Sequence, residues 1–405
     1  MKKCICIAFC IAGLFAAAWT AQSAAMRIVI IGDSTVMTYT ASDSLRGWGQ
    51  EIGLFFNTGA VTVVNKAIGG RSSRSFIEDG HWTSTLGILQ KGDFLFIQFG
   101  HNDRSTVAER YTDTAQYRQY LTQYITESRA KGAIPVLVSP MNMNAWNGTT
   151  LREVFNEGAS DYHAAMLRVA NAQKVPFIDL EQKTAKIFQS LGQVYLTAFI
   201  FNTGEGTHFQ EMGALLNARC IAEGIKELST DADVGKFSAL LGPQYMVTVK
   251  SNKSGAGMIT ASGTYPPGAA LVIKTVPNSG QIFQKWQDAS GTQVSVKTQF
   301  RDTLGEAAVS FTALYQGGTA TLTRQPGSAH GHLIYVNGHI NGHYEIVSGR
   351  PIVSVSAIDV TGRIKERKST DGHRVMLGPV VGSGVTFFVI ETANSALVTP
   401  NLRLK

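Results

Sequence analysis

The chain has 405 residues, of which 44% are hydrophobic and 16% are charged. This composition excludes a long disordered chain or a coiled coil, and the length suffices for two or three domains. The formal net charge of +7 is unevenly spread: residues 26–230 hold 18 Lys and Arg against 19 Asp and Glu, whereas residues 231–405 hold 16 against 10.

The first 25 residues have the pattern of a secretory signal peptide. Lys2 and Lys3 form a basic start, residues 5–18 are an apolar run, and small residues precede a cleavage position after Ala25. The alternative is an uncleaved anchor. We expect the mature protein to be secreted, with a periplasmic, extracellular or cell-surface destination.

Cysteine usage and hydropathy limit the mature chain further. Cys4, Cys6 and Cys10 leave with the signal peptide, and Cys220 alone remains. We therefore expect no internal disulfide bond. No later segment approaches 18 uninterrupted apolar residues, so we expect no membrane span.

Residues 26–230 alternate between short apolar runs and helical periods. Helices are expected from the Tyr117–Ile125 spacing up to Gly132, over residues 157–173 and over 211–228. Runs that are apolar throughout are typical of parallel strands covered on both faces. The alternation predicts an α/β domain with a parallel sheet, whose strands are expected at residues 27–31, 61–64, 93–99, 134–138 and 175–178.

Beyond residue 230 the helical periodicity disappears. Residues 231–244 are expected to be a linker, and a small all-β module is expected over 245–316, with Phe283 and Trp286 as core anchors. Its run Tyr-x-Val-x-Val, then Tyr-Pro-Pro-Gly, then Phe-x-x-Trp resembles a repeat type appended to many exported bacterial proteins. A second β module of unknown role is expected over 317–405, with Asn337-Gly338 as a tight hairpin turn.

The positive charge of residues 231–405 suggests two hypotheses. It could hold the protein near an acidic polysaccharide or a cell surface, or it could be an ordinary solvated surface. The densest basic cluster, residues 363–368, lacks interleaved aromatic side chains, so nucleic-acid binding is not expected.

Four short blocks in the α/β region carry chemically capable residues. The first three follow consecutive predicted strands, so they should converge at one edge of the sheet, where open α/β sheets bind ligands. If a helix starts just after a serine there, the serine's backbone N–H also points at the site, where it could stabilise a negative oxygen. The blocks are Gly32-Asp33-Ser34, Gly69-Gly70-Arg71-Ser72-Ser73-Arg74-Ser75, Gly100-His101-Asn102-Asp103 and Gly206-Thr207-His208.

Together these blocks resemble the SGNH (GDSL-like) hydrolases, and within that group the rhamnogalacturonan acetylesterase branch. The resemblance covers about residues 26–230. It implies a flavodoxin-like three-layer α/β sandwich with a five-stranded parallel sheet, here followed by two small all-β modules. It also implies that no cofactor and no metal take part.

The resemblance also implies roles for individual residues. Ser34 would be the nucleophile that attacks an ester carbonyl, and His208 would take its proton and return it to the leaving alcohol. The oxyanion would be held by the backbone N–H of Ser34, the backbone N–H of Gly70 and the side-chain amide of Asn102.

At one position the chain departs from the family pattern. The family has Asp three residues before the catalytic histidine, and this chain has Glu205. Glutamate is one methylene longer, so three hypotheses stay open: a Ser-His-Glu triad, a Ser-His dyad with Glu205 peripheral, and an impaired enzyme.

Other polar and aromatic residues have two interpretations each. Arg71 and Arg74 could bind substrate carboxylates or brace the oxyanion loop, and Trp146 could line the substrate groove. Asp33, Asp103 and His101 are expected to fix local structure. The histidines at 330, 332, 339 and 343 are expected to lie on the surface rather than to bind metal.

These features predict a secreted carbohydrate esterase that removes acetyl groups from a plant cell-wall polysaccharide, rhamnogalacturonan above all. Acetylated polysaccharide is the expected partner. The alternatives within the superfamily are a xylan acetylesterase and a lipase-like or thioesterase-like hydrolase. The alternative of another class is a non-catalytic polysaccharide-binding or cell-surface protein whose hydrolase domain is impaired.

Overall fold

A computed structural model describes residues 25–41, 43–158, 160–278 and 281–317, and then 334–338, 344–348, 352–358, 364–369, 374–377, 387–392 and 395–398. Residues 1–24 of the predicted signal peptide lie outside these residues, as do His330, His332, His339 and His343. In the described part of the chain, no helix combines the length and the apolar character needed to cross a membrane.

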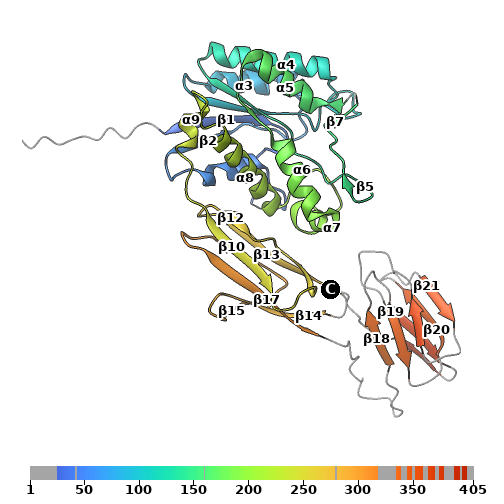
Figure 1. Cartoon of the computed structure of the whole chain (residues 1–405). Helices are drawn as coiled ribbons and strands as arrows, with labels where there is room; N and C mark the ends of the chain where they lie inside the picture. The colour runs from blue at the N-terminus through green and yellow to red at the C-terminus, as the bar shows by residue number, and fades with distance from the viewer. Residues whose placement is uncertain are drawn as a thin grey trace, which may run out of the picture.

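The α/β region is built on one parallel sheet of five strands (Figure 1). The strand order is β2-β1-β3-β4-β9, which confirms the predicted flavodoxin-like sheet. All five predicted strands are present within a few residues of their expected bounds. They are β1 Met26–Gly32, β2 Val61–Asn65, β3 Phe94–Gln98, β4 Ile134–Val138 and β9 Phe177–Ile178.

Alternate residues of each strand enter two separate cores, which makes three layers. Val29 and Ile31 pack beneath helices α3 His81–Ile88, α4 Thr114–Ala130 and α5 Tyr162–Gln173. Ile28 and Ile30 pack on the other face, against helices α1 Trp48–Glu51, α6 Leu180–Leu191, α8 Glu211–Glu227 and α9 Val234–Ser238. The two-sided burial explains why these strands read as continuous apolar runs.

One predicted helix starts later than its periodicity suggests. The helix expected from residue 157 begins at Tyr162, because strands β7 Asn156–Glu157 and β8 Ser160–Asp161 first form a small hairpin. Asp161 then caps the helix, since its Oδ1 accepts a hydrogen bond of 2.9 Å from the backbone N–H of Ala164.

The span expected to be a linker contains a packed helix. Helix α9 places Val234 and Phe237 one turn apart, and both are buried. The ring of Phe237 lies 4.5 Å from that of Phe94 on the central strand β3, measured between centroids. Part of residues 231–244 therefore belongs to the α/β core.

The first β module is a sandwich of two sheets. Trp286 is fully buried between them, as predicted. One sheet has the order β12-β10-β17-β14-β15, from β12 Gly263–Tyr265, β10 Tyr245–Ser251, β17 Val309–Gly317, β14 Gln281–Gln287 and β15 Gln293–Ser295. The other has the order β11-β13-β16, from β11 Gly257–Ile259, β13 Ala270–Pro277 and β16 Gln299–Thr303.

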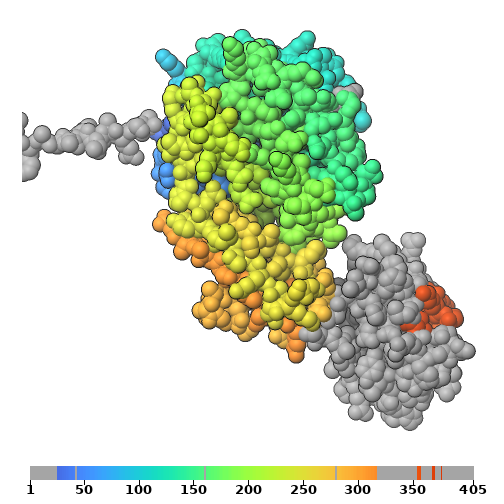
Figure 2. Space-filling view, in the orientation of Figure 1, coloured from blue at the N-terminus to red at the C-terminus, as the bar shows by residue number. Residues whose placement is uncertain are grey.

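This module is docked against the α/β region rather than tethered to it (Figure 2). Leu271 of β13 and Met212 of α8 belong to one continuous buried core. Lys274 of β13 donates a 2.7 Å hydrogen bond to the carbonyl of Ala198, in the π-helical turn η2 Leu196–Ile200. Tyr195 Oη, just before that turn, accepts a 2.6 Å bond from the backbone N–H of Ala261.

The remaining described residues are all strands, arranged in two antiparallel sheets. The Asn337-Gly338 prediction is wrong, because both residues pair with the next strand and the chain reverses after them. The first sheet contains β18 Ile334–Gly338, β19 Tyr344–Ser348 and β22 Arg374–Leu377; the second contains β21 Ile364–Ser369, β20 Ile352–Ile358, β23 Phe387–Thr392 and β24 Ser395–Val398.

Candidate active site

Ser34 lies in a tight turn directly after β1, on top of a buried polar network. Asp33 Oδ1 accepts hydrogen bonds from the backbone N–H of Thr35 at 2.9 Å and from its hydroxyl at 2.7 Å. The Thr35 hydroxyl in turn accepts a 3.0 Å bond from the amide of Gln98 at the end of β3. Because this network ties the turn to the central strand, the sheet itself sets the position of Ser34.

The hydroxyl of Ser34 is joined to an imidazole and a carboxylate by hydrogen bonds. His208 Nε2 lies 2.8 Å from Ser34 Oγ, across 174 positions of sequence. His208 Nδ1 lies 2.6 Å from Glu205 Oε2. The extra methylene of Glu205 is therefore accommodated, and its carboxylate occupies the position that a triad requires.

Residues 202–208 form a compact loop that carries both His208 and Glu205. The backbone N–H of Asn202 donates to the carbonyl of His208 at 2.8 Å, which closes the loop. The side-chain amide of Asn202 donates to Glu205 Oε1 at 2.8 Å, so both carboxylate oxygens have a partner. Asn202 is not among the site residues predicted from the sequence, although an Asn that begins a Gly-rich turn is a usual signal for such a side-chain bond.

Two backbone N–H groups near Ser34 are free donors. Among the described residues, no acceptor bonds the N–H of Ser34 or the N–H of Gly70. Gly70 has φ +77°, a conformation that favours glycine, and a Cβ on the preceding Gly69 would lie 3.7 Å from Ser34 Cβ. The loop that carries Gly70 therefore runs directly beside the serine.

Asn102 is held against the same loop. Its side-chain amide donates a 3.1 Å hydrogen bond to the carbonyl of Arg71, which uses one of its two N–H bonds. Its neighbour Asp103 accepts from the backbone N–H and the hydroxyl of Ser73, at 3.0 and 2.5 Å. This cross-link fixes the Gly70 loop relative to Asn102, a role for Asp103 beyond its own turn.

Burial and hydrogen bonding shift the pKa values of three carboxyl groups at the site. Burial raises the pKa of Asp103 to about 7, although the bonds from Ser73 oppose that rise. Burial also opposes ionisation of Asp33, but the facing His101 and the bonds from Thr35 leave the pKa of Asp33 below its usual value. For Glu205 the bonds from His208 and Asn202 outweigh desolvation and lower the pKa.

His101 does not join the catalytic constellation. Its side chain is almost fully buried, and its Nδ1 lies 3.6 Å from Asp33 Oδ2, beyond ordinary hydrogen-bonding distance. Its ring packs edge-on against Phe155, 4.8 Å between centroids. It lies beneath the site, as the structural interpretation expects.

The two arginines singled out from the sequence are already paired. Arg71 Nε lies 2.8 Å from Asp79 Oδ2, and Arg74 Nε lies 3.6 Å from Glu78 Oε2. Arg74 also donates to the carbonyl of Ala108 at 2.5 Å. These contacts favour the bracing interpretation for both.

Trp146 lies on the histidine side of the site. It is half-buried in β5 Trp146–Asn147, and its indole N–H donates to Asn144 Oδ1 at 2.7 Å. The backbone N–H of Asn144 donates to the carbonyl of Gly206, in the loop of residues 202–208, at 2.9 Å. Trp146 is thus connected to the loop through one residue.

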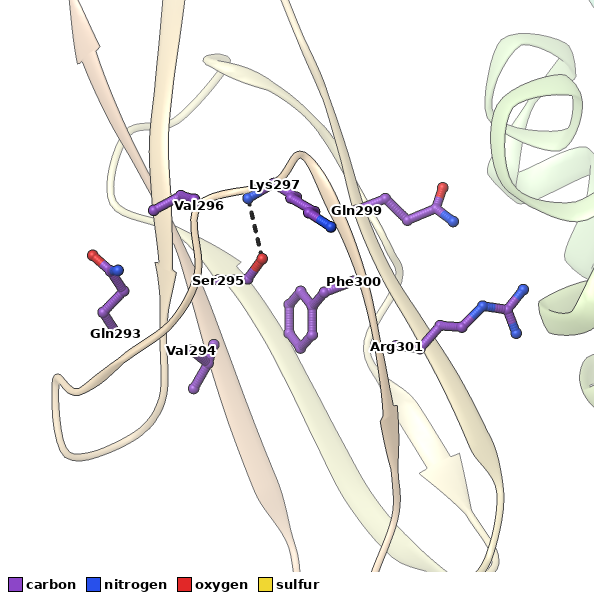
Figure 3. A pocket seen from close by; sticks show the side chains of 8 residues that line it. All are labelled: Gln293, Val294, Ser295, Val296, Lys297, Gln299, Phe300 and Arg301. Atoms are coloured by element: carbon purple, nitrogen blue, oxygen red, sulfur yellow. Dashed lines mark hydrogen bonds between the residues drawn. The ribbon is translucent and has the colours of Figure 1, made fainter.

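The first β module has a hollow of its own, of about 610 Å³, around the connection that leads from β15 in one sheet to β16 in the other (Figure 3). It shares no residue with the Ser34 site, and the side chains that line it include no catalytic pair. Within the described ranges, no three His, Cys, Asp or Glu side chains are grouped so that they could hold a metal ion.

Comparison with known proteins finds two family models that match this chain. The model of the GDSL-like lipase/acylhydrolase family matches residues 30–213, and that of the divergent InlB B-repeat domain matches residues 245–331. The probable rhamnogalacturonan acetylesterase YesY of Bacillus subtilis is 42% identical over 211 residues, which cover 50% of this chain and 94% of YesY. The rhamnogalacturonan acetylesterase RhgT of the same organism is 34% identical, over 50% of this chain and 90% of RhgT.

Among solved structures, protein YxiM of Bacillus subtilis has a TM-score of 0.47 and 26% sequence identity, over 52% of this chain and 58% of YxiM. The family model spans residues 30–213, a range that includes the Ser34, Gly70, Asn102 and His208 blocks. The chain belongs to the GDSL-like lipase/acylhydrolase family and is a carboxylic ester hydrolase.

Proposed function

We propose that this protein is an acetylesterase that acts on an acetylated, uronic-acid-containing cell-wall polysaccharide, with Ser34, His208 and Glu205 as its catalytic triad. The observation that carries the proposal is the unbroken chain of hydrogen bonds from Glu205 through His208 to the Ser34 hydroxyl. Such a chain is the arrangement that activates a serine towards an ester carbonyl.

The reaction would proceed through an acetyl-serine. Ser34 Oγ attacks the acetyl carbonyl carbon while His208 Nε2 takes the hydroxyl proton. The tetrahedral oxyanion then collapses, the bond from carbon to the sugar oxygen breaks, and His208 returns the proton to that oxygen. In the second half, His208 deprotonates a water that attacks the acetyl carbon, the bond from that carbon to Ser34 Oγ breaks, and His208 returns the proton to Oγ. Acetic acid leaves and loses its proton to water as acetate.

The oxyanion would be stabilised by the N–H of Ser34, the N–H of Gly70 and the side-chain amide of Asn102. Two structural observations support these three hydrogen-bond donors. Both backbone donors lack a partner in the described structure, and the Asn102 amide is oriented by its bond to Arg71 with one N–H to spare. Preorganised donors of this kind act in the transition state without reorganisation.

Glu205 would orient His208 and stabilise the imidazolium that forms during the reaction. The 2.6 Å contact with Nδ1 and the lowered pKa of the carboxyl support the triad over the dyad. The lowered pKa of Glu205 keeps its carboxylate charged, and in the proposed triad it orients His208 without taking up a proton.

The names of the relatives support acetylated polysaccharide as the substrate, with rhamnogalacturonan first. The test is acetate release from a panel of acetylated pectins, xylans and mannans, with Ser34→Ala as the control. Release from rhamnogalacturonan with a silent Ser34→Ala control supports the proposal. Release only from xylan would shift the substrate, and hydrolysis only of long acyl esters would point to a lipase-like enzyme.

We also propose that the protein is exported and that the β modules attach it to a polysaccharide or a cell surface. The signal-like residues 1–25 and the excess positive charge beyond residue 230 support this. Expression of the full chain in a bacterium tests it. Secreted protein that begins at Met26 and sediments with insoluble cell-wall polysaccharide supports both parts, and soluble protein that retains Met1 contradicts the export.

A further inference from the structure

A second cavity lies beside the loop that carries Gly70. It has a volume of about 520 Å³, within the range usual for ligand sites. It is lined by backbone and side chains from two segments, residues 70–79 and 107–110. Gly70 lines this cavity and is also one of the proposed oxyanion donors. When the acetyl group of a polymer is bound at Ser34, the neighbouring sugar units of that polymer can therefore reach the cavity.

Three arginines line the cavity, and two of them are engaged. Arg71 is bonded to Asp79, and Arg74 contacts Glu78 and the carbonyl of Ala108. Each of these two guanidinium groups therefore already has a carboxylate neighbour.

Arg110 is the unengaged guanidinium of the cavity. In the part of the chain that the structure describes, no carboxylate and no carbonyl accepts a hydrogen bond from it. A Cβ built on Gly70 would lie 3.6 Å from its Nη2 and 3.7 Å from its Cζ, so the guanidinium lies beside Gly70, about one methyl group away. A side chain at position 70 would narrow the space that the guanidinium occupies.

The backbone of Arg110 is fixed although its side chain is exposed. Its N–H donates to the carbonyl of Val107 at 3.0 Å, and its own carbonyl accepts from the hydroxyl of Thr112 at 3.2 Å. Thr112 is tied in turn to the carbonyl of Asp103, at 2.9 Å. The guanidinium is thus presented from a loop anchored to the same residue that holds the Gly70 loop.

We propose that Arg110 binds the carboxylate of a uronic acid unit in the polymer whose acetyl group is bound at Ser34. Arg110 is thereby a specificity-determining residue, and this inference rests on the proposed function. A guanidinium forms paired hydrogen bonds to a carboxylate that a neutral sugar cannot offer. Glu109, which also lines the cavity, is the opposing charge that such a ligand must approach.

The test compares Arg110→Gln with the wild-type enzyme on two substrates, acetylated rhamnogalacturonan and 4-nitrophenyl acetate. We expect the ratio of kcat/KM on the polymer to kcat/KM on the small ester to fall roughly 10- to 100-fold, the effect of losing a hydrogen bond between charged groups. Methyl esterification of the polymer's carboxylates should lower the same ratio for the wild type and leave it unchanged for Arg110→Gln.

Two further variants sharpen the test. Arg168→Gln removes an exposed arginine of α5, outside the cavity, and should leave the ratio at the wild-type value. Glu109→Gln removes the opposing charge and should raise the ratio.

Binding gives a measure that does not depend on turnover. In the Ser34→Ala background, a deacetylated rhamnogalacturonan oligosaccharide should bind roughly tenfold more weakly, by calorimetry, when Arg110 is also replaced by Gln. If Arg110→Gln changes neither the ratio of kcat/KM values nor the affinity for the oligosaccharide, the proposed role of Arg110 is wrong. The proposed esterase activity would be unaffected by that result. A wild-type enzyme that releases no acetate from any polysaccharide refutes the proposed function instead.

Discussion

The two sides of the proposed catalytic centre are built in different ways. The serine side stands on the sheet: Asp33, Thr35 and Gln98 beneath Ser34 are all buried and bonded to one another. The histidine side stands on a loop, and the side chains of His208 and Glu205 are 29% and 33% exposed. When a buried side chain is removed, its former hydrogen-bond partner is left without a partner. On an exposed loop, water can take the place of part of a lost hydrogen bond.

This comparison predicts that effects on turnover will be larger near the serine than at the carboxylate of the loop. The strongest test removes Ser34 or His208, whose hydroxyl and imidazole join the two sides. Ser34→Ala and His208→Ala should each lower kcat by roughly 10⁴- to 10⁶-fold, because nucleophile and base act as one unit. The double variant should be no slower than either single variant in a 4-nitrophenyl acetate assay. Multiplying effects would mean that the 2.8 Å contact is not the catalytic one.

The next effect lies on the serine side. Asn102→Ala should lower kcat by roughly 10²- to 10³-fold with little change in KM, because the amide would act on the oxyanion and not on the bound ester. Steady-state kinetics measure the split. Thermal unfolding serves as the control, since the bond from Asn102 to Arg71 is also lost. A change confined to KM would place Asn102 in substrate binding.

On the histidine side the effect should be smaller. Glu205→Gln should lower kcat by roughly 10- to 100-fold, since an amide keeps one acceptor for His208 but loses the charge that stabilises the imidazolium. Asn202→Ala is the matched variant that loses only the support of the carboxylate, and it should cost a few-fold at most. Unchanged turnover in Glu205→Ala would favour the dyad.

The smallest effect on turnover, and the clearest on stability, is expected at Asp103. Burial raises the pKa of Asp103 to about 7 in the folded protein, whereas the pKa of an unfolded Asp is about 4. The folded state therefore holds the proton more tightly, and this contribution to stability is fully present below about pH 4. That contribution is lost as the pH rises through about 7. Relative to Asp103→Asn, the wild type should therefore lose up to roughly 4 kcal/mol of unfolding free energy between pH 4 and pH 8.

Urea unfolding at several pH values measures this difference. Asp302→Asn, an exposed residue of the first β module, is the control and should run parallel to the wild type. Parallel curves for Asp103→Asn as well would show that the Asp103 carboxyl is ionised at low pH in spite of its burial.

Much of the fold could be predicted because the signals are local. The run at 134–138 is apolar throughout and forms a strand with the predicted bounds. The helix start at Tyr162 could not be found from periodicity, because a hairpin and the Asp161 cap decide it. In α9, Val234 and Phe237 are too few for a periodic signal, yet they pack firmly into the core.

The site divides in the same manner. The motif blocks predicted which residues meet, and the structure brings Ser34, His208 and Glu205 together. Other features depend on which side chains face each other across loops. Examples are the ion pair of Arg71 with Asp79, the exposed position of Arg110 beside Gly70, and the hydrogen bond that Asp103 accepts from Ser73. Those pairings have no sequence spacing of their own, so only coordinates could supply them.

The contact between Lys274 and the turn at Ala198 has a consequence for how this enzyme can be handled. YesY and RhgT are matched almost over their full length by half of this chain, so they leave little room for a companion module. In this protein the π-turn that precedes the histidine loop is covered by such a module. Cutting the chain at residue 244 to imitate its shorter relatives would also expose apolar side chains of α8 that the module now buries. The hydrolase half should therefore be expressed together with its first β module.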